Sequence, residues 1–316
     1  MNFRSDVRFC AIGVVVYHPD LDILSNLLAA VSGDGSDIWL FLNSPLMPEA
    51  YEKLRNVAKS NLIFINEGKN LGLGVAYNRL VEAVIAVGAQ KLLIFDQDSS
   101  PTPSIMSQLC TAYESLCAVG ERPAVVAPLP VSVDSEHFKS PRIFRKYAKV
   151  HGSLRSAEFV ISSGSLLDLK AFKQIGRFRE DFFIDAIDIE WCFRSWSRGY
   201  SCWIDSAVLM PHRLGQGVIR VPIVNMLLTR QLPSRFYTYI RNQVAMLRLP
   251  HTPLCWKLRI LPYLMAQCVI YLVVSQGLRR NIFRAFRFGI VDGILLRLGV
   301  GQRDQLFFDP KQKLPG

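Results

Sequence analysis

Residues 91–101 constrain the fold more than any other part of the 316-residue sequence. Four apolar residues, 92–95, run directly into Asp96 and Asp98, and a Ser-Ser-Pro sequence follows. A short apolar run bounded by turn residues predicts a strand that is buried on both faces of a sheet. Open α/β sheets bind ligands at the carboxyl ends of their strands. The two carboxylates therefore predict a site for a divalent cation, which prefers oxygen ligands, or else a solvated acidic turn.

Strand-like and helix-like segments alternate along the first two thirds of the chain. This alternation predicts an α/β fold with a mostly parallel, Rossmann-like sheet flanked by helices on both faces. The apolar runs that predict strands cover residues 9–17, 37–42, 61–65, 92–95, 124–127, 159–167 and 200–205. The segments that predict helices cover residues 21–31, 51–60, 70–87, 101–119 and 182–194.

The C-terminal third carries almost all of the net charge of +11. Residues 220–303 contain thirteen basic residues and one acid, and they are also the most apolar part of the chain. This combination favours binding to an anionic membrane surface and not to nucleic acid. The seven cysteines lack the spacing of a metal site, which predicts reduced, mostly buried thiols.

A second acidic cluster lies between large apolar residues further along the chain. Asp185, Asp188 and Glu190 are surrounded by Phe, Ile and Trp. Desolvation favours the neutral form of a carboxyl group, which makes it a better general base near neutral pH. The alternative is an acidic helix N-terminus, with Glu190 and Arg194 forming an ordinary ion pair.

Three weaker signals accompany the acidic clusters. Gly72 and Gly74 open a predicted helix, where backbone amides can approach a phosphate, although such glycines also serve turns. Small residues at 163–165 interrupt a strand-like run and leave room for a ligand, or form a bulge. His212 follows a predicted strand and is either a ligand or a structural histidine.

Taken in order, these segments resemble the inverting glycosyltransferases of family 2. The resemblance is closest to the bacterial rhamnosyltransferases that build O-antigen and related cell-surface polysaccharides. It implies a GT-A fold, a nucleotide-sugar donor held through Mg²⁺ or Mn²⁺, and transfer with inversion. The matching segments are residues 14–19, 70–78, 95–98, 163–165, 182–194, 212–215 and 235–242.

The resemblance also assigns roles to individual residues. Asp96 and Asp98 match the Asp-x-Asp motif that holds the metal, with Asp98 the direct ligand, and His212 matches a residue that helps to hold the metal or diphosphate. Asp188 matches the base that removes the proton of the acceptor hydroxyl. Leu42 departs from the acid that many relatives place before Asn43, so recognition of the base is less defined. The positions implied in donor binding are Tyr17, His18, Asn43, Asn70, Gly72, Asn78, Asp96 and Gly164.

The expected organisation is a GT-A domain over residues 1–250 and a basic, apolar helical region over 251–316. Residues 260–274 form an apolar run shorter than the roughly 20 residues that span a bilayer. We expect this region to lie on a membrane or to pack on the domain or on a second copy of the chain.

The resemblance implies L-rhamnose transfer from a dTDP- or UDP-sugar to a lipid-linked glycan, at the cytoplasmic face of the bacterial inner membrane. Two alternatives remain, a nucleotidyltransferase and a non-catalytic, basic membrane-binding protein.

Overall fold

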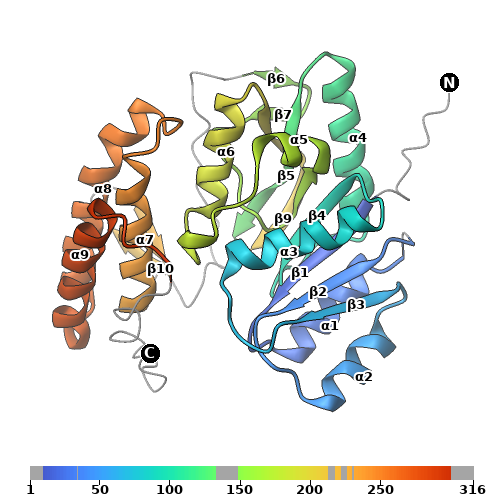
Figure 1. Cartoon of the computed structure of the whole chain (residues 1–316), viewed down its shortest axis with the longest axis horizontal. Helices are drawn as coiled ribbons and strands as arrows, with labels where there is room; N and C mark the ends of the chain where they lie inside the picture. Colours follow the sequence, from blue (N-terminus) through green and yellow to red (C-terminus); the bar gives the residue numbers. More distant parts are fainter. Residues whose placement is uncertain are drawn as a thin grey trace. The chain divides into compact units, whose positions relative to one another are not determined.

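The computed structural model describes residues 10–33, 35–132, 149–212, 218–221, 226–229 and 231–299 (Figure 1). The chain divides into two compact units. The first unit comprises residues 1–178 and 191–213, and the second comprises 179–190 and 214–316. The contacts thus group residues 214–250 with the C-terminal region, whereas the sequence predicts a boundary at residue 250.

The first unit is built on a large sheet with the strand order β3-β2-β1-β4-β8-β5-β9-β7-β6. Its first four strands are parallel, as the alternation of strands and helices predicts. These strands are β1 (Cys10–Val16), β2 (Ile38–Leu42), β3 (Leu62–Asn66) and β4 (Lys91–Asp96).

Beyond β4 the sheet is mixed. Strand β8 runs antiparallel to both of its neighbours, β5 and β9 are parallel to each other, and the β6–β7 hairpin closes the edge in antiparallel pairing. The prediction of a mostly parallel sheet therefore describes the N-terminal half. The strands of the second half are β5 (Pro123–Ser132), β6 (Val150–His151), β7 (Leu154–Ser156), β8 (Ser165–Asp168) and β9 (Ser201–His212).

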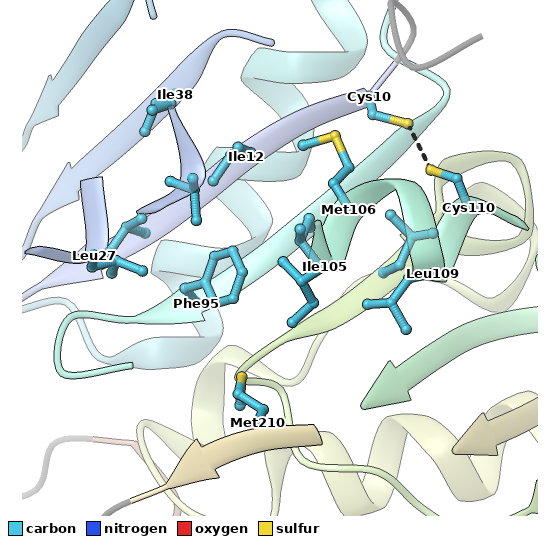
Figure 2. Close-up of a cluster of buried hydrophobic side chains, with 14 of the residues drawn as sticks. Cys10, Ile12, Leu27, Ile38, Phe95, Ile105, Met106, Leu109, Cys110 and Met210 are labelled. Carbon is cyan, nitrogen blue, oxygen red and sulfur yellow. Dashed lines mark hydrogen bonds between the residues drawn. The ribbon is translucent and has the colours of Figure 1, made fainter. Parts of the chain in front are cut away.

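Helices cover both faces of the parallel half, because side chains alternate between the faces of each strand. Ile12 and Val14 of β1 point into the core cluster formed with α1 and α4, part of which Figure 2 shows. On the opposite face, Leu80 of α3 lies against Gly13, where an added Cβ would be 3.2 Å from it. The helices are α1 (Leu21–Val31), α2 (Pro48–Val57), α3 (Leu73–Ala86), α4 (Ile105–Ala118) and α5 (Leu169–Ile175).

All seven cysteines are free thiols, and five of them are buried, as predicted. Within the core, the Cys10 and Cys110 sulfurs lie 3.4 Å apart (Figure 2). The hydrogen bond between them lowers the pKa of Cys10 and raises the pKa of Cys110.

The second unit is a cluster of helices around a separate apolar core. Helix α9 approaches α7 closely, since a Cβ on Gly293 would lie 2.6 Å from the Arg241 carbonyl oxygen. A glycine pair spaced by four residues, Gly289 and Gly293, permits this approach. The elements are η3 (Glu180–Phe182), β10 (Val218–Val221), β11 (Met226–Thr229), α7 (Pro233–Met246), α8 (Leu254–Val274), η5 (Gln276–Leu278) and α9 (Arg279–Ile294).

Three predicted elements differ from those observed. Helix α6 (Ile187–Ser197) begins five residues later than the sequence predicts, because the residues before it adopt left-handed backbone angles. The strand predicted over 159–167 is reduced to β8, since its small polar residues form a turn. Helix α8 has 21 residues, six more than the apolar run, because Lys257 and Arg259 are good helix formers that extend it.

Candidate active site

The carboxyl ends of β1, β2 and β4 lie at the same level of the first unit's sheet. The register pairs the last residue of β1 with the last residue of β2, and Val15 with Asp96 of β4. Tyr17, Asn43 and Gln97, which follow the three strands, therefore lie at one edge. The strand order reverses at this point, since β2 and β3 extend the sheet on one side of β1 and β4 on the other. Ligands of open α/β sheets bind at such a switch point.

Gln97 connects the loops that follow β1 and β4. Its Oε1 accepts a hydrogen bond from the Tyr17 N–H at 2.7 Å, and its Nε2 donates to the Tyr17 carbonyl at 3.0 Å. The next backbone N–H, that of His18, donates to Ser44 Oγ of the β2 loop at 2.7 Å. His18 has a φ of 45°, and its ring lies against that of Tyr17, with the centroids 4.5 Å apart. These bonds fix the backbone of two residues with exposed aromatic side chains at the edge of the sheet.

Asp96 and Asp98 lie in a turn that begins where β4 ends. The N–H of Ser99 donates to the Asp96 carbonyl at 3.1 Å, which closes the turn. The backbone N–H of Asp96 donates to Ser163 Oγ at 3.2 Å, and the Ser163 and Ser99 hydroxyls are 2.6 Å apart. Tyr77 donates to Asp96 Oδ1 at 3.5 Å. Because the strand ends at Asp96, the carboxylate of Asp98 is exposed in the turn that follows.

Asn43, Asn70 and Gly72 shape the loop that leads into α3. Asn43 is buried, and its Oδ1 accepts from the Leu71 N–H at 3.0 Å while its Nδ2 donates to the Gly72 carbonyl at 3.4 Å. Asn70 Oδ1 accepts from the Gly72 N–H at 2.9 Å. Gly72 has a φ of 83°, a conformation in which glycine is favoured. This geometry gives Asn43 and Asn70 a role in fixing the loop, and their predicted contact with the donor stays a prediction.

Two other predicted donor-binding residues have structural roles. Asn78 is buried, and its side chain exchanges hydrogen bonds of 3.0 and 2.9 Å with the backbone of Phe178. Gly164 has a φ of 78°, and a Cβ there would lie 2.5 Å from the Met210 sulfur. The backbone N–H of Gly164 donates to the Ile94 carbonyl at 2.7 Å, which ties it to β4. These contacts give Asn78 and Gly164 structural roles, and their contact with the donor stays a prediction.

Asp188 belongs to the second unit, in the first turn of α6. It is half-buried, so it is less desolvated than the surrounding apolar sequence predicts, and its Oδ1 accepts from the Ile189 N–H at 2.8 Å. Glu190 is fully buried and lies 2.8 Å from His251 Nε2. Asp185 precedes the helix, and its Oδ1 accepts from Arg235 Nη2 at 3.1 Å. The cluster therefore divides into a partly accessible carboxylate, Asp188, and two that pair within the unit.

The residues at the end of β4 fit a divalent metal in their chemistry. Asp96 and Asp98 supply carboxylate oxygens, which Mg²⁺ and Mn²⁺ prefer, and such ions are often bound by one or two carboxylates together with substrate phosphates. Among the residues that the structure describes, no group of three His, Cys, Asp or Glu side chains gathers around a common point. His212, the third predicted ligand, ends β9, but its side chain lies outside the described part of the structure.

The sequence does not mark two residues that shape this edge, Gln97 and Ser163. Gln97 is the spacer of the acidic motif, and its partner Tyr17 is 80 positions away. Ser163 lies in the small-residue patch that the sequence predicts as space for a ligand, but its hydroxyl supports Asp96. Only the side chain's contacts in the folded chain reveal either role.

The chain is similar to known proteins in sequence and in fold. No protein-family model matches the chain. The chain is 26% identical over 253 residues to the dTDP-rhamnosyl transferase RfbF of Shigella flexneri, covering 78% of this chain and 82% of the relative.

Solved glycosyltransferase structures share the fold. TarS 1-349 of S. aureus, crystallised with UDP-GlcNAc, has a TM-score of 0.56 and 14% identity over 94% of this chain and 83% of its own. A longer TarS chain has a TM-score of 0.54 and 14% identity over 94% of this chain, which spans only 50% of its length. GalNAc-T7 with UDP, GalNAc and Mn²⁺ has a TM-score of 0.53 and 11% identity over 90% of this chain and 56% of its own.

The relative and the shared fold confirm the resemblance that the motifs predict. The nucleotidyltransferase and the non-catalytic membrane binder are not supported by any of these matches. The chain therefore has the GT-A fold, and its similarity in sequence to a dTDP-rhamnosyl transferase supports a glycosyltransferase related to the rhamnosyltransferases.

Proposed function

We propose that the chain transfers L-rhamnose from dTDP-rhamnose, with inversion, to a hydroxyl group of a lipid-linked cell-surface glycan such as O-antigen. The name of its relative, a dTDP-rhamnosyl transferase, supports the choice of sugar and nucleotide. The observation that carries the proposal is the position of two carboxylates at the switch point of the sheet, since Asp96 ends β4 and Asp98 lies in the turn after it.

The donor side of the reaction belongs to the first unit. Asp96 and Asp98 would hold the divalent metal, which when bound neutralises the charge that develops on the leaving nucleoside diphosphate. Tyr17 and His18 are exposed beside them and offer a stacking surface and a hydrogen-bonding ring to the nucleoside. Buried Leu42 precedes Asn43, so recognition of the base falls to these aromatic side chains.

The acceptor side of the reaction belongs to Asp188. Inversion requires a base that takes the proton of the attacking hydroxyl on the face of the sugar opposite the leaving group. A half-buried carboxylate in the first turn of a helix is accessible enough to take up this proton, and its Oδ1 accepts the Ile189 N–H at 2.8 Å. Asp188 and the metal-binding pair thus have separate tasks, proton removal and leaving-group stabilisation.

A membrane surface at the cytoplasmic face of the inner membrane is the proposed location. Helix α8 buries one face against α7 and α9, and the other face exposes an apolar stripe at helical spacing. The exposed residues of this stripe are Leu254, Leu258, Leu261, Met265, Val269 and Val273. Helix α9 adds exposed arginines at 279, 280, 284 and 287. Such apolar and basic surfaces bind the interface of anionic bilayers.

By length and composition alone, α8 is also the one helix that meets the requirements of a membrane span among the residues that the structure describes. Its buried face in the three-helix core favours a peripheral helix, which lies along the membrane and does not cross it.

A donor screen tests the proposal. The protein is heated with dTDP-rhamnose, UDP-GlcNAc or dTDP alone, with Mn²⁺ or with EDTA, and the unfolding temperature is recorded. We expect dTDP-rhamnose with Mn²⁺ to raise it most, and EDTA to abolish the increase. Asp98→Asn removes the stabilisation, whereas Asp22→Asn, which changes an exposed carboxylate of α1, retains it. Equal stabilisation by all nucleotides in EDTA would count against the proposal.

A further inference from the structure

The loop that precedes α6 has a backbone that its residues do not favour. Phe183, Asp185 and Ala186 have φ angles of 62°, 63° and 61°, in the left-handed region that residues with a Cβ rarely adopt. Phe183 is the centre of a γ-turn with ψ of −61°, closed by a hydrogen bond of 2.7 Å from Ile184 N–H to the Phe182 carbonyl. This form of the γ-turn is rare and strained. Interactions outside the loop must hold it in place.

Asn242 of α7 donates hydrogen bonds to three backbone carbonyl groups of this loop. Its Nδ2 donates to the carbonyl oxygens of Phe182 at 2.9 Å, Ile184 at 2.8 Å and Asp185 at 3.0 Å. Asn242 is fully buried, so these bonds do not compete with water. An amide NH₂ has two hydrogens, and three carbonyl groups converge on it only because the backbone turns back on itself.

Two arginines of α7 reinforce this contact. Arg241 is buried, its Nε donates to Asn242 Oδ1 at 3.1 Å, and its Nη2 donates to the Phe182 carbonyl at 3.3 Å. Arg235 binds Asp185 Oδ1 from the surface. Asp185 Oδ2 is buried without a hydrogen-bond partner among the described residues, which is a further unfavourable feature of the loop. The hydrogen bonds from α7 therefore offset the free-energy cost of the left-handed backbone angles and of the buried Asp185 Oδ2.

The loop determines where α6 begins. The Ala186 carbonyl accepts the first helical hydrogen bond, from the Glu190 N–H at 2.9 Å. Asp188 lies between these two residues, in the first turn. Any change in the backbone angles of Asp185 and Ala186 therefore moves the carboxylate of Asp188 directly.

We propose that Asn242 is a positioning residue for Asp188, holding the strained loop so that the carboxylate is placed for proton removal. This inference rests on the proposed role of Asp188 as the base. Proton transfer depends steeply on the placement of the base, whereas donor binding by the first unit's residues does not use Asp188. Loss of the hydrogen bonds from Asn242 to the loop should therefore lower kcat and leave donor affinity unchanged.

The test compares Asn242→Ala with Gln243→Ala. Gln243 is the neighbouring buried amide of α7, but its Oε1 accepts from Trp256 Nε1 of α8 and not from the loop. Turnover of dTDP-rhamnose is measured with octyl-glycoside acceptors, and donor binding by calorimetry with Mn²⁺. We expect Asn242→Ala to lose at least tenfold in kcat with donor Kd within twofold of wild type. Gln243→Ala should keep kcat within twofold, whatever its loss of thermal stability.

A second substitution separates positioning from simple folding defects. Glycine adopts positive φ without the penalty of a Cβ, so Ala186→Gly should restore part of the kcat lost in Asn242→Ala and leave Gln243→Ala unchanged. If Asn242→Ala does not fold, Asn242→Ser, which keeps one donor, takes its place in the same comparison.

Asp188→Asn separates a failure of the positioning role of Asn242 from a failure of the proposed role of Asp188 as the base. Asn242→Ala with wild-type kcat, beside an inactive Asp188→Asn that still binds donor, overturns the positioning role and leaves the proposed function intact. An active Asp188→Asn overturns the assignment of the base and the positioning role together.

Discussion

Gln97, which has no proposed catalytic role, stabilises the edge of the sheet that carries Asp96 and Asp98. Gln97 satisfies both the N–H and the carbonyl of Tyr17, so one amide fixes the β1 loop to the β4 loop. The sequence predicts a site at the two aspartates because an apolar run followed by acidic residues is a local pattern. Gln97 and Ser163 act through partners that only the fold brings near, and no local pattern can predict them.

Replacing Gln97 by leucine should weaken both the fold and the site. Gln97→Leu removes two hydrogen bonds to the Tyr17 backbone, at about 0.5–1.5 kcal/mol each, so we expect a loss of about 1–3 kcal/mol in the free energy of unfolding by urea. Because Tyr17 and His18 then lose their fixed position, dTDP should bind several-fold more weakly in calorimetry with Mn²⁺. Gln108→Leu, an exposed glutamine of α4, serves as the control. Unchanged dTDP affinity in Gln97→Leu would show that the hydrogen bonds between Gln97 and Tyr17 do not support nucleotide binding.

At the scale of elements, the sequence predicts the parallel strands and their helices well. Each of β1 to β4 is a short, continuous apolar run, and turn residues bound it. The prediction fails before α6, where the left-handed angles of Asp185 and Ala186 replace the expected first helical turn. Apolar periodicity predicts a helix through this loop. The prediction is wrong because Asn242, which is distant in sequence, holds the loop in its left-handed conformation.

The amphipathic character of α8 and α9 gives a prediction of its own. Arg284→Glu/Arg287→Glu reverses two exposed charges of α9, and each basic side chain near an anionic surface contributes about 1 kcal/mol. We expect binding to vesicles containing phosphatidylglycerol to fall about tenfold or more, measured by co-sedimentation. Lys59→Glu/Lys173→Glu makes the same charge change on exposed sites of the first unit and should bind as wild type does. If both double variants bind equally, α9 is not the membrane contact.

At the scale of the whole molecule, the proposed chemistry is divided between two parts of the chain. Asp96 and Asp98 belong to the first compact unit, and Asp188 belongs to the second. Composition and motif order predict the GT-A fold and a glycosyltransferase, because both follow from patterns repeated over most of the sequence. The unit boundaries do not follow from composition, since residues 179–190 and 214–250 are grouped with the C-terminal helices in the second unit.

In the proposed reaction, Asp96 and Asp98 bind the metal and the donor, whereas Asp188 removes the proton of the acceptor. The most direct measurement follows donor binding and rhamnosyl transfer together in wild type, Asp98→Asn and Asp188→Asn, with Mn²⁺ and dTDP-rhamnose. We expect Asp98→Asn to lose metal-dependent donor binding. We expect Asp188→Asn to bind the donor normally but to transfer rhamnose about 10²–10⁴-fold more slowly, because it lacks the general base. Wild-type transfer by either variant would contradict these roles.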